Sequence, residues 1–446
     1  AQRILRAEPY IRDAKISFIP NKAGSDHQGE KVRVETWDNW SLLPTFSASR
    51  NGGESQFSAG IKEDNLLGLG ISTRFKYQSS TDRTGYKFAA TTPVNIIKHA
   101  TFSVDFYDNS DGQATHLYFV KPFYTLEAPH MYSAEYLDDN RVDTLKQNGQ
   151  ERTEFIHDVT YNNARFGWLL NNNGDTITRI ITGLTQDRHR FSHVPQYPNA
   201  TLPQNRDFLY PWLAYQYLQD DFKVLKNIYL INDNEDFNLG WQHYIKLGLE
   251  TRDLDNTKVG YHLNWQTRRG FQAHDHLLLL NMAGEGVFST RQKDYFQVNV
   301  AAEYFYRIDP KWTAYSKLRL STSQNNYLDK PLTLGDNNGI RGYPNSYQYG
   351  DNQWTFTAEI RNYPNINLYQ LAELGWAVFA DVGQASGGNT AYNETNSVIG
   401  SVGAGLRLYS SKSSYGNVAH IDLSVPFTTG EAVNSWEWRF LVRNRF

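Results

Sequence analysis

The last twelve residues, 435–446, read SWEWRFLVRNRF, and they decide the fold class of this chain. Trp436, Trp438, Phe440, Val442 and Phe446 fall on one face of an extended strand, while the charged residues fall on the other. A period of two residues indicates a β-strand rather than a helix. The same alternation recurs at residues 71–77, 101–107, 257–267, 296–307, 311–320, 353–361 and 417–425. The sequence therefore predicts an all-β protein.

Composition excludes several classes of protein. The 446 residues are 40% hydrophobic and 14% aromatic, and the mean hydropathy is -0.61. No window approaches the roughly 20 apolar residues that a spanning helix needs, which excludes a helical membrane protein. A net charge of -3 without a long basic run argues against a nucleic-acid partner. The chain has no cysteine, so disulfides, thiolate metal sites and cysteine nucleophiles are excluded.

The position of charged residues on the strands distinguishes a soluble β-sandwich from a transmembrane β-barrel. In a soluble sandwich one face forms the core, the other meets solvent, and connections are short at both ends. Here Arg and Glu occupy mid-strand positions, aromatic residues gather at the ends of the apolar face, and tight turns alternate with long polar loops. These features are typical of a transmembrane antiparallel β-barrel, with apolar residues toward lipid and a polar lumen. A soluble sandwich or propeller is the alternative.

The pattern predicts about twenty wall strands, an even number as in single-chain bacterial barrels. They lie near residues 42–49, 54–62, 68–79, 84–92, 99–108, 113–123, 131–138, 152–168, 175–187, 208–218, 238–250, 257–267, 275–286, 294–307, 311–320, 353–362, 374–383, 398–410, 417–426 and 435–446. Residues 222–232, FKVLKNIYLIN, have the composition of a strand. A span there would reverse every later strand, so we expect a connection.

Motifs of known enzyme chemistry are absent from the sequence. It contains no GxSxG elbow, HExxH, P-loop, GxGxxG or EF-hand spacing. The twelve histidines are scattered, and the pairs His274/His276 and His189/His193 are interpreted as lumen or loop residues rather than metal ligands. We therefore expect no enzymatic activity, no catalytic residues, no metal and no cofactor.

Residues 321–351 form a long loop between two predicted strands, and long loops inside compact architectures are often functional. The centre of the loop, LGDNNGIRGYP, sets apolar anchors and turn-forming glycines around a single arginine, Arg341. Such a tip could fold back into the barrel, where a buried guanidinium would need carboxylate partners.

The next two predicted strands supply these partners. Glu359 lies on the lumen face of its strand, and Asp381 shares a face with Phe379 and Gly383, where small residues leave room for a loop. The pattern predicts a bidentate contact between Arg341 and the carboxylate of Asp381 or Glu359. The alternative is that Arg341 is solvated and that the carboxylates merely line a pore.

The chain carries several motifs of one known superfamily. Ile340, Arg341, Gly342 and Tyr343 form IRGY in a long loop five strands before the C-terminus, followed by TFTAEIRN and VFADVG. ESQFSAGIKEDNLLGLG fits a second strand and first periplasmic turn, and Phe446 closes an alternating final strand. This combination resembles the BamA/TamA-type outer-membrane assembly superfamily, whose relatives include the two-partner secretion transporters. The likeness covers nearly the whole chain, most strongly from about residue 311.

The resemblance implies a location, a docking site and a domain order. It implies an integral protein of the outer membrane of a Gram-negative bacterium, with Arg341 docked at Asp381 and Glu359 on the lumen wall. Residues 1–37 are similar to the end of a periplasmic POTRA domain, which leaves residues 38–446 as the barrel. Barrels of the superfamily have sixteen strands, so the surplus between residues 140 and 270 implies either additional hairpins or an enlarged barrel.

The first and last predicted strands, 42–49 and 435–446, would meet at a seam of the barrel, and this seam indicates a mechanism. A barrel that inserts or exports polypeptides needs a weak seam, because an exposed strand edge templates an incoming strand. Pro44 cannot donate to a ladder, so we expect poor pairing with the strand that carries Trp438, Phe440 and Phe446.

The predicted function is insertion or translocation of unfolded outer-membrane or secreted polypeptides through this seam. Outer-membrane lipids and periplasmic accessory proteins are the further expected partners. A passive porin, a surface receptor and a dedicated exporter of a single exoprotein are the alternatives.

Overall fold

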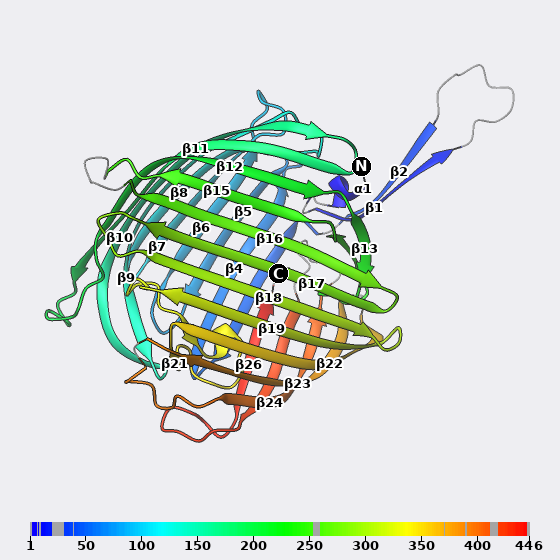
Figure 1. Cartoon of the computed structure of the whole chain (residues 1–446). Helices are drawn as coiled ribbons and strands as arrows, with labels where there is room; N and C mark the ends of the chain where they lie inside the picture. Colours follow the sequence, from blue (N-terminus) through cyan, green and yellow to red (C-terminus); the bar gives the residue numbers. More distant parts are fainter. Residues whose placement is uncertain are drawn as a thin grey trace, which may run out of the picture.

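The computed structural model describes residues 2–443 except 7, 9, 20–30, 39, 253–258, 370, 389 and 411–417. Twenty antiparallel strands close into one barrel (Figure 1), in which each strand pairs with its neighbours in sequence and β26 returns to β3. The wall strands are β3 (Leu42–Asn51), β4 (Glu54–Leu66), β5 (Ile71–Ser79), β6 (Thr84–Pro93), β7 (Thr101–Asn109), β8 (Gly112–Lys121), β9 (His130–Gln147), β10 (Gln150–Asn172), β11 (Thr176–His193), β12 (Arg206–Gln219), β15 (Gln242–Leu249), β16 (Tyr261–Ala273), β17 (His276–Phe288), β18 (Tyr295–Arg307), β19 (Trp312–Gln324), β22 (Asn352–Leu368), β23 (Ala372–Ser386), β24 (Ile399–Tyr409), β25 (Val418–Pro426) and β26 (Glu437–Arg443).

Three small groups of elements lie outside the wall. The N-terminal segment holds α1 (Gln2–Arg6) and the hairpin of β1 (Ile11–Ile19) and β2 (Lys31–Asp38). The connection between β12 and β15 forms a hairpin of β13 (Phe222–Lys226) and β14 (Asn234–Asn238). The long loop between β19 and β22 contains β20 (Thr333–Leu334), the 3-10 helix η1 (Asp336–Asn338) and β21 (Gln348–Tyr349). No helix in the described residues is long and apolar enough to cross a membrane.

The predicted fold class is confirmed, since each of the twenty predicted windows overlaps one wall strand. The sixteen strands implied by the resemblance are wrong for this chain. The wall strands of the region that holds the surplus, β10, β11, β12, β15 and β16, are hydrogen-bonded on both sides within the wall, so the barrel is enlarged. Residues 222–232 are a connection, as predicted.

Side chains alternate around the wall as the two-residue period requires. On β26, Trp438 is exposed on the outside, whereas Glu437 and Arg439 are buried toward the interior. On β23, Val378 is exposed, whereas Phe379 and Asp381 are buried. An apolar outer face and a charged lumen are the expected arrangement for a sheet closed within lipid.

We refer to the end of the barrel at which β3 begins as the N-terminal end, and to the opposite end as the loop end. The β13–β14 hairpin lies at the N-terminal end beside α1 (Figure 1), where Arg6 donates to Asp236 at 2.7 and 2.9 Å. Residues 325–351, called the lumen loop below, leave β19 at the loop end.

Candidate functional site: the lumen loop and its docking wall

The lumen loop is anchored inside the barrel by apolar side chains. Leu334, Ile340, Tyr343 and Tyr347 are almost fully buried against Ala385 of β23 and Ile399 of β24. Tyr343 also donates its hydroxyl to the backbone carbonyl of Gly400 at 2.9 Å. The loop therefore has a small core of its own against one side of the wall, which fixes the position of the arginine between these anchors.

Arg341 meets the two carboxylates that the sequence singled out. Its Nε and Nη2 donate to Asp381 at 2.6 and 2.8 Å, a bidentate contact, and its Nη1 lies 2.9 Å from Glu359. The guanidinium carbon also lies 3.4 Å from the centroid of the Phe379 ring, a cation–π contact. Arg341 is 6% exposed and Asp381 1% exposed, so the pairing compensates two desolvated charges.

The backbone around the arginine depends on glycine. Gly342 has a positive φ of 87°, a conformation that other residues adopt at a cost. The part of the wall that receives the loop, here called the docking wall, consists of Glu359 on β22 and Phe379, Asp381 and Gly383 on β23. At Gly383, a Cβ atom would lie 2.6 Å from the carbonyl oxygen of Trp354 and 3.0 Å from Ile340 Cδ1. Gly383 thus lets the loop approach the wall closely.

Glu359 links the loop to a second inward element. Its other oxygen accepts from Arg361 Nε at 2.8 Å, and Arg361 Nη1 donates to the backbone carbonyl of Ile228 at 3.2 Å. Ile228 belongs to the β13–β14 hairpin. A chain of polar contacts therefore runs from Arg341 through Glu359 and Arg361 to that hairpin.

The β13–β14 hairpin enters the lumen from the N-terminal end. Its carboxylate Glu235 accepts from the backbone N–H groups of Ile228, Tyr229 and Leu230 at 3.0 to 3.2 Å, which orders the tip. The apolar side chains of the hairpin pack against lumen-facing residues of distant strands. These contacts involve Leu225, Ile228 and Leu239 with Leu277, Phe305 and Tyr315, and Leu230 and Ile231 with Tyr363, Tyr409 and Val418.

A charged chamber of about 430 Å³ lies between the hairpin and the lumen loop. Tyr229 and Ile231 border it from the hairpin, and Asp336 and Arg341 border it from the loop. Its remaining lining is rich in cationic side chains from the wall, namely Lys317, Arg319, Arg361, Arg407 and Arg439. The two inward elements thus occupy the lumen from opposite ends.

The lumen loop also contacts both sides of the seam between β26 and β3. Asp336 of the loop accepts from Arg439 of β26 at 3.0 Å. Asn345 Nδ2 lies 3.3 Å from Glu54 Oε2 on β4, next to β3. Across the seam itself, Arg50 of β3 donates to Glu437 of β26 at 2.9 Å.

The residues predicted for the seam lie on the two expected strands. Pro44 is in β3, and Trp438 and Phe440 are in β26, which spans 7 described residues compared with 15 for β23. Phe446 lies outside the described residues. The closed strand order includes a β26–β3 pair, so the seam is shut in this structure.

The stem of the lumen loop, residues 325–332, is fixed on the side of the barrel opposite the seam. Arg206 of β12 donates through Nη1 and Nη2 to the two oxygens of Asp329, each at 2.7 Å. Burial alone would raise the pKa of the Asp329 carboxyl, but the hydrogen bonds and charge of Arg206 outweigh it and lower this pKa.

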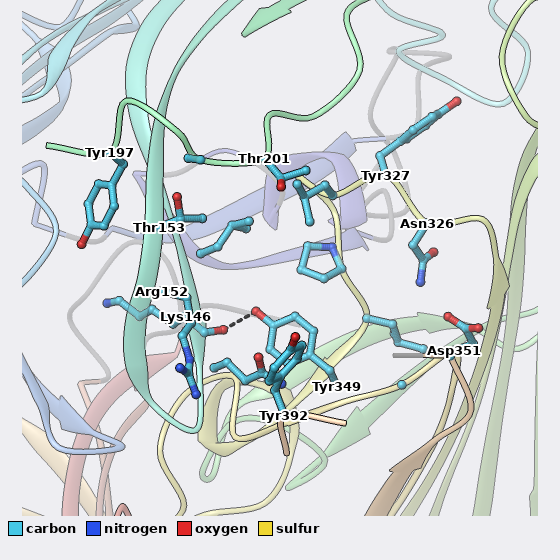
Figure 2. A pocket seen from close by; sticks show the side chains of 18 of the residues that line it. Lys146, Arg152, Thr153, Tyr197, Thr201, Asn326, Tyr327, Tyr349, Asp351 and Tyr392 are labelled. Atoms are coloured by element: carbon cyan, nitrogen blue, oxygen red, sulfur yellow. Dashed lines mark hydrogen bonds between the residues drawn. The ribbon is translucent and has the colours of Figure 1, made fainter. Parts of the chain in front are cut away.

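A second cavity, of about 880 Å³, opens at the loop end (Figure 2). The stem of the lumen loop, the β11–β12 connection and the β9–β10 hairpin border it, with Tyr197, Tyr327, Tyr349 and Tyr392 among its lining residues. Tyr349 donates its hydroxyl to the carbonyl of Lys146, which joins the loop to β9.

Sequence reasoning found the loop arginine and its partners but missed two features. The plugging role of residues 222–238 was not predicted, although the density of apolar residues in FKVLKNIYLIN is higher than a solvated connection needs. The juxtaposition of His157 and His189 was also missed, because these residues lie on neighbouring strands and are far apart in sequence.

Comparison with known proteins finds a similarity to one family over part of the chain. Residues 235–408 match the family model described as haemolysin secretion/activation protein ShlB/FhaC/HecB. This region runs from β14 to β24 and contains Arg341, Glu359 and Asp381. No curated protein matches the chain in sequence.

Solved structures of similar proteins include BamA and CdiB. BamA from Haemophilus ducreyi lacking POTRA domains 1-3 is 13% identical, with 99% of this chain and 76% of that chain covered and a TM-score of 0.44. CdiB from Escherichia coli is 13% identical, with 96% and 67% covered and a TM-score of 0.48. CdiB from Acinetobacter baumannii is 12% identical, with 98% and 66% covered and a TM-score of 0.46.

The family match falls on the strands and loop that build the docking wall. This chain is therefore a closed antiparallel β-barrel whose residues 235–408 are similar to the haemolysin secretion/activation proteins.

Proposed function

We propose that this barrel inserts or exports unfolded polypeptides through the seam between β3 and β26. The observation that carries the proposal is the position of the lumen loop, which is docked on β23 through Arg341 and reaches residues on both sides of the seam. A brace with contacts on both sides can hold the seam shut at rest. Its release would free strand edges that pair with an incoming chain.

The occupied lumen favours this function over a passive porin. A porin needs an open aqueous channel through its barrel. Here the lumen loop and the β13–β14 hairpin enter from opposite ends and are joined through Glu359 and Arg361. A dedicated exporter of one secreted protein would use the same seam and lumen and differs only in the identity of the polypeptide.

The N-terminal segment fits the same proposal. Residues 1–37 are proposed to be the end of a periplasmic POTRA-like domain, which would place the N-terminal end of the barrel in the periplasm. The β1–β2 hairpin would then present strand edges on the side from which polypeptides arrive. Outer-membrane lipids and periplasmic accessory proteins are the further proposed partners.

A reversible lock across the seam tests the proposal. The chain has no cysteine, so the double variant R50C/E437C would carry only the two thiols placed at the seam, and a short cleavable bis-thiol reagent can join them. The proposal predicts that locking the seam depletes the client proteins, which are the polypeptides that the barrel inserts or exports, from the outer membrane or the culture medium. Cleavage of the crosslink should restore their amounts. The control D108C/Q113C places the same crosslink within the β7–β8 hairpin, where Gln113 Nε2 lies 3.1 Å from Asp108. Unchanged protein profiles with the seam locked would contradict the proposal.

A further inference from the structure

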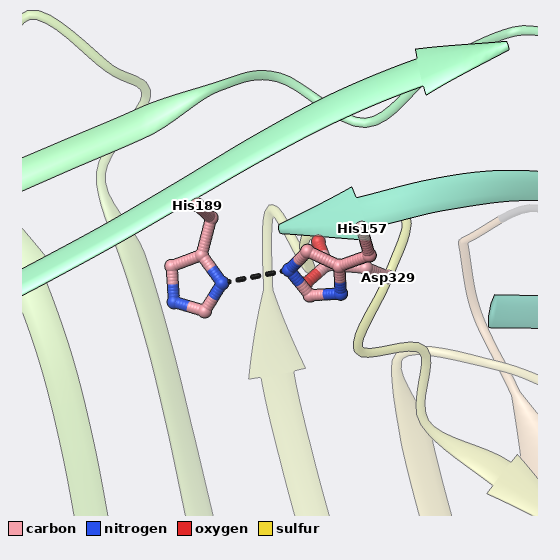
Figure 3. A group of neighbouring side chains, drawn as sticks. All are labelled: His157, His189 and Asp329. Carbon is pink, nitrogen blue, oxygen red and sulfur yellow. Dashed lines mark hydrogen bonds between the residues drawn. The ribbon is translucent and has the colours of Figure 1, made fainter. Parts of the chain in front are cut away.

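Two buried histidines face each other near the loop end of the barrel (Figure 3). His157 of β10 and His189 of β11 are diagonal neighbours in the ladder, and His157 Nε2 lies 2.8 Å from His189 Nδ1. They are 2% and 7% exposed. An oxygen of Asp329, in the stem of the lumen loop, completes a group whose three potential ligand atoms lie within 4.8 Å of one another.

The outer nitrogen of each ring is held by a carboxylate. His157 Nδ1 lies 2.6 Å from Asp143, and His189 Nε2 lies 3.0 Å from Asp187. Arg141 Nη2 lies 3.2 Å from the same His157 nitrogen, but the shorter contact to Asp143 requires a proton between ring and carboxylate. Both outer nitrogens are therefore assigned as donors.

This assignment leaves the two inner nitrogens facing each other. In a neutral imidazole, a proton on one nitrogen leaves a lone pair on the other. Two lone pairs at 2.8 Å repel each other unless a cation lies between them, either a proton or a metal ion. Metal-ligating histidines commonly have this arrangement, in which a carboxylate holds the second N–H and orients the ring.

The charge around the pair also favours a cation. Four carboxylates lie in or beside the cluster, from Asp139, Asp143, Asp187 and Asp329, against two guanidinium groups, from Arg141 and Arg206. Lys330 is a further cation close to Asp187. Arg206 binds both oxygens of Asp329, yet each carboxylate oxygen has a second lone pair, so Asp329 can keep this ion pair and also ligate a metal.

We propose that His157 Nε2, His189 Nδ1 and a carboxylate oxygen of Asp329 bind a divalent transition-metal ion of the zinc type. Two imidazoles and one carboxylate suit such an ion, with water as a fourth ligand. Ligand distances of about 2.0–2.1 Å in a tetrahedral site would set the two nitrogens about 3.3 Å apart. The rings would therefore separate by about half an ångström from their present 2.8 Å. The ion would fasten the stem of the lumen loop to β10 and β11.

Metal titration of the full chain in detergent, after treatment with a chelator, tests this proposal. We expect one Zn²⁺ or Co²⁺ per chain and a Co²⁺ absorption spectrum typical of a tetrahedral site. H157A and H189A should each weaken binding at least about 100-fold, and D187N, which keeps both rings, about 10-fold. H116A is the matched control, because His116 pairs with a carboxylate, Glu135, at 3.0 Å on another part of the wall. It should bind the ion like the unmodified chain.

Three outcomes would overturn the proposal. They are the absence of binding to the folded, unmodified chain, equal binding by folded H157A or H189A, and equal loss of binding in H116A. The shift in gel mobility on heating shows whether each variant is folded. If both histidine variants fail to fold, D187N decides, and unchanged affinity in that variant would refute the site.

Discussion

Arg341 is a buried charge that two carboxylates and an aromatic ring compensate. Breaking a buried ion pair by removing one partner typically costs about 3–5 kcal/mol, because the remaining charge is left uncompensated. The loss of Arg341 would remove the bidentate partner of Asp381, which keeps the hydroxyl of Thr357, and one of the two arginines that contact Glu359, which keeps Arg361. Arg341 is therefore the main charged contact between the loop and β23, beside the apolar anchors of the loop.

R341A should destabilise the folded barrel by about 3–5 kcal/mol. R341K should have an intermediate effect, because it keeps the charge but not the bidentate geometry. The temperature at which the folded band disappears on a gel measures the change. R268A is the control, since Arg268 of β16 is exposed. A transition temperature for R341A equal to that of R268A would refute the brace.

Glu359 contacts both Arg341 and Arg361, so its charge serves both inward elements. E359Q should loosen the lumen loop and the β13–β14 hairpin together, which predicts longer and more frequent open events in single-channel recordings. E135Q changes a carboxylate on another part of the wall, where it contacts His116. Identical recordings for the two variants would show that Glu359 does not couple the loop to the hairpin.

At the scale of elements, the strands were predictable and the inward hairpin was not. Alternation places Trp438 outside and Arg439 inside from the sequence alone, because a closed wall imposes one rule on every strand. The Arg341–Asp381 contact could be predicted because the wall residue had a definite face and the loop had one arginine. Ile228 and Leu230, in contrast, find partners such as Phe305 and Tyr409 on strands distant in sequence, and no local pattern encodes these contacts.

The histidine pair was unpredictable for a different reason. Which residue of β10 lies beside His189 depends on the register of the β10–β11 ladder, and this register shifts between Leu169 and Asn171. A single shift moves every later pairing by one residue and therefore changes the face that side chains share. Counting along the sequence could not place His157 next to His189.

The β13–β14 hairpin should limit the flow of ions through the lumen. Replacing residues 223–237 with a short glycine linker removes the apolar tip that packs against side chains of β17, β18, β19, β22, β24 and β25. We expect a larger single-channel conductance in planar bilayers for this variant, while the unmodified chain gives small or flickering currents. Large steady currents from the unmodified chain would favour the porin alternative instead.

At the scale of the whole molecule, the described residues form a wall of twenty strands with two elements inside it. The lumen loop is fastened to β12 at its stem, to β23 at Arg341 and to β26 at Asp336. It therefore crosses the barrel from the side opposite the seam to the seam itself. This connection gives a route by which binding in the lumen could change the stability of the seam.

Photocrosslinking in living cells tests most directly whether polypeptides pass through this barrel. A photoreactive residue at Arg319, on the chamber wall, or at Phe46, on the outer face of β3, would report on the lumen and the seam. Leu213, exposed on the outer face of β12, is the control. Our account predicts polypeptide adducts from positions 319 and 46 and none from position 213. The absence of adducts from both test positions, with the barrel folded and its clients being produced, would contradict it.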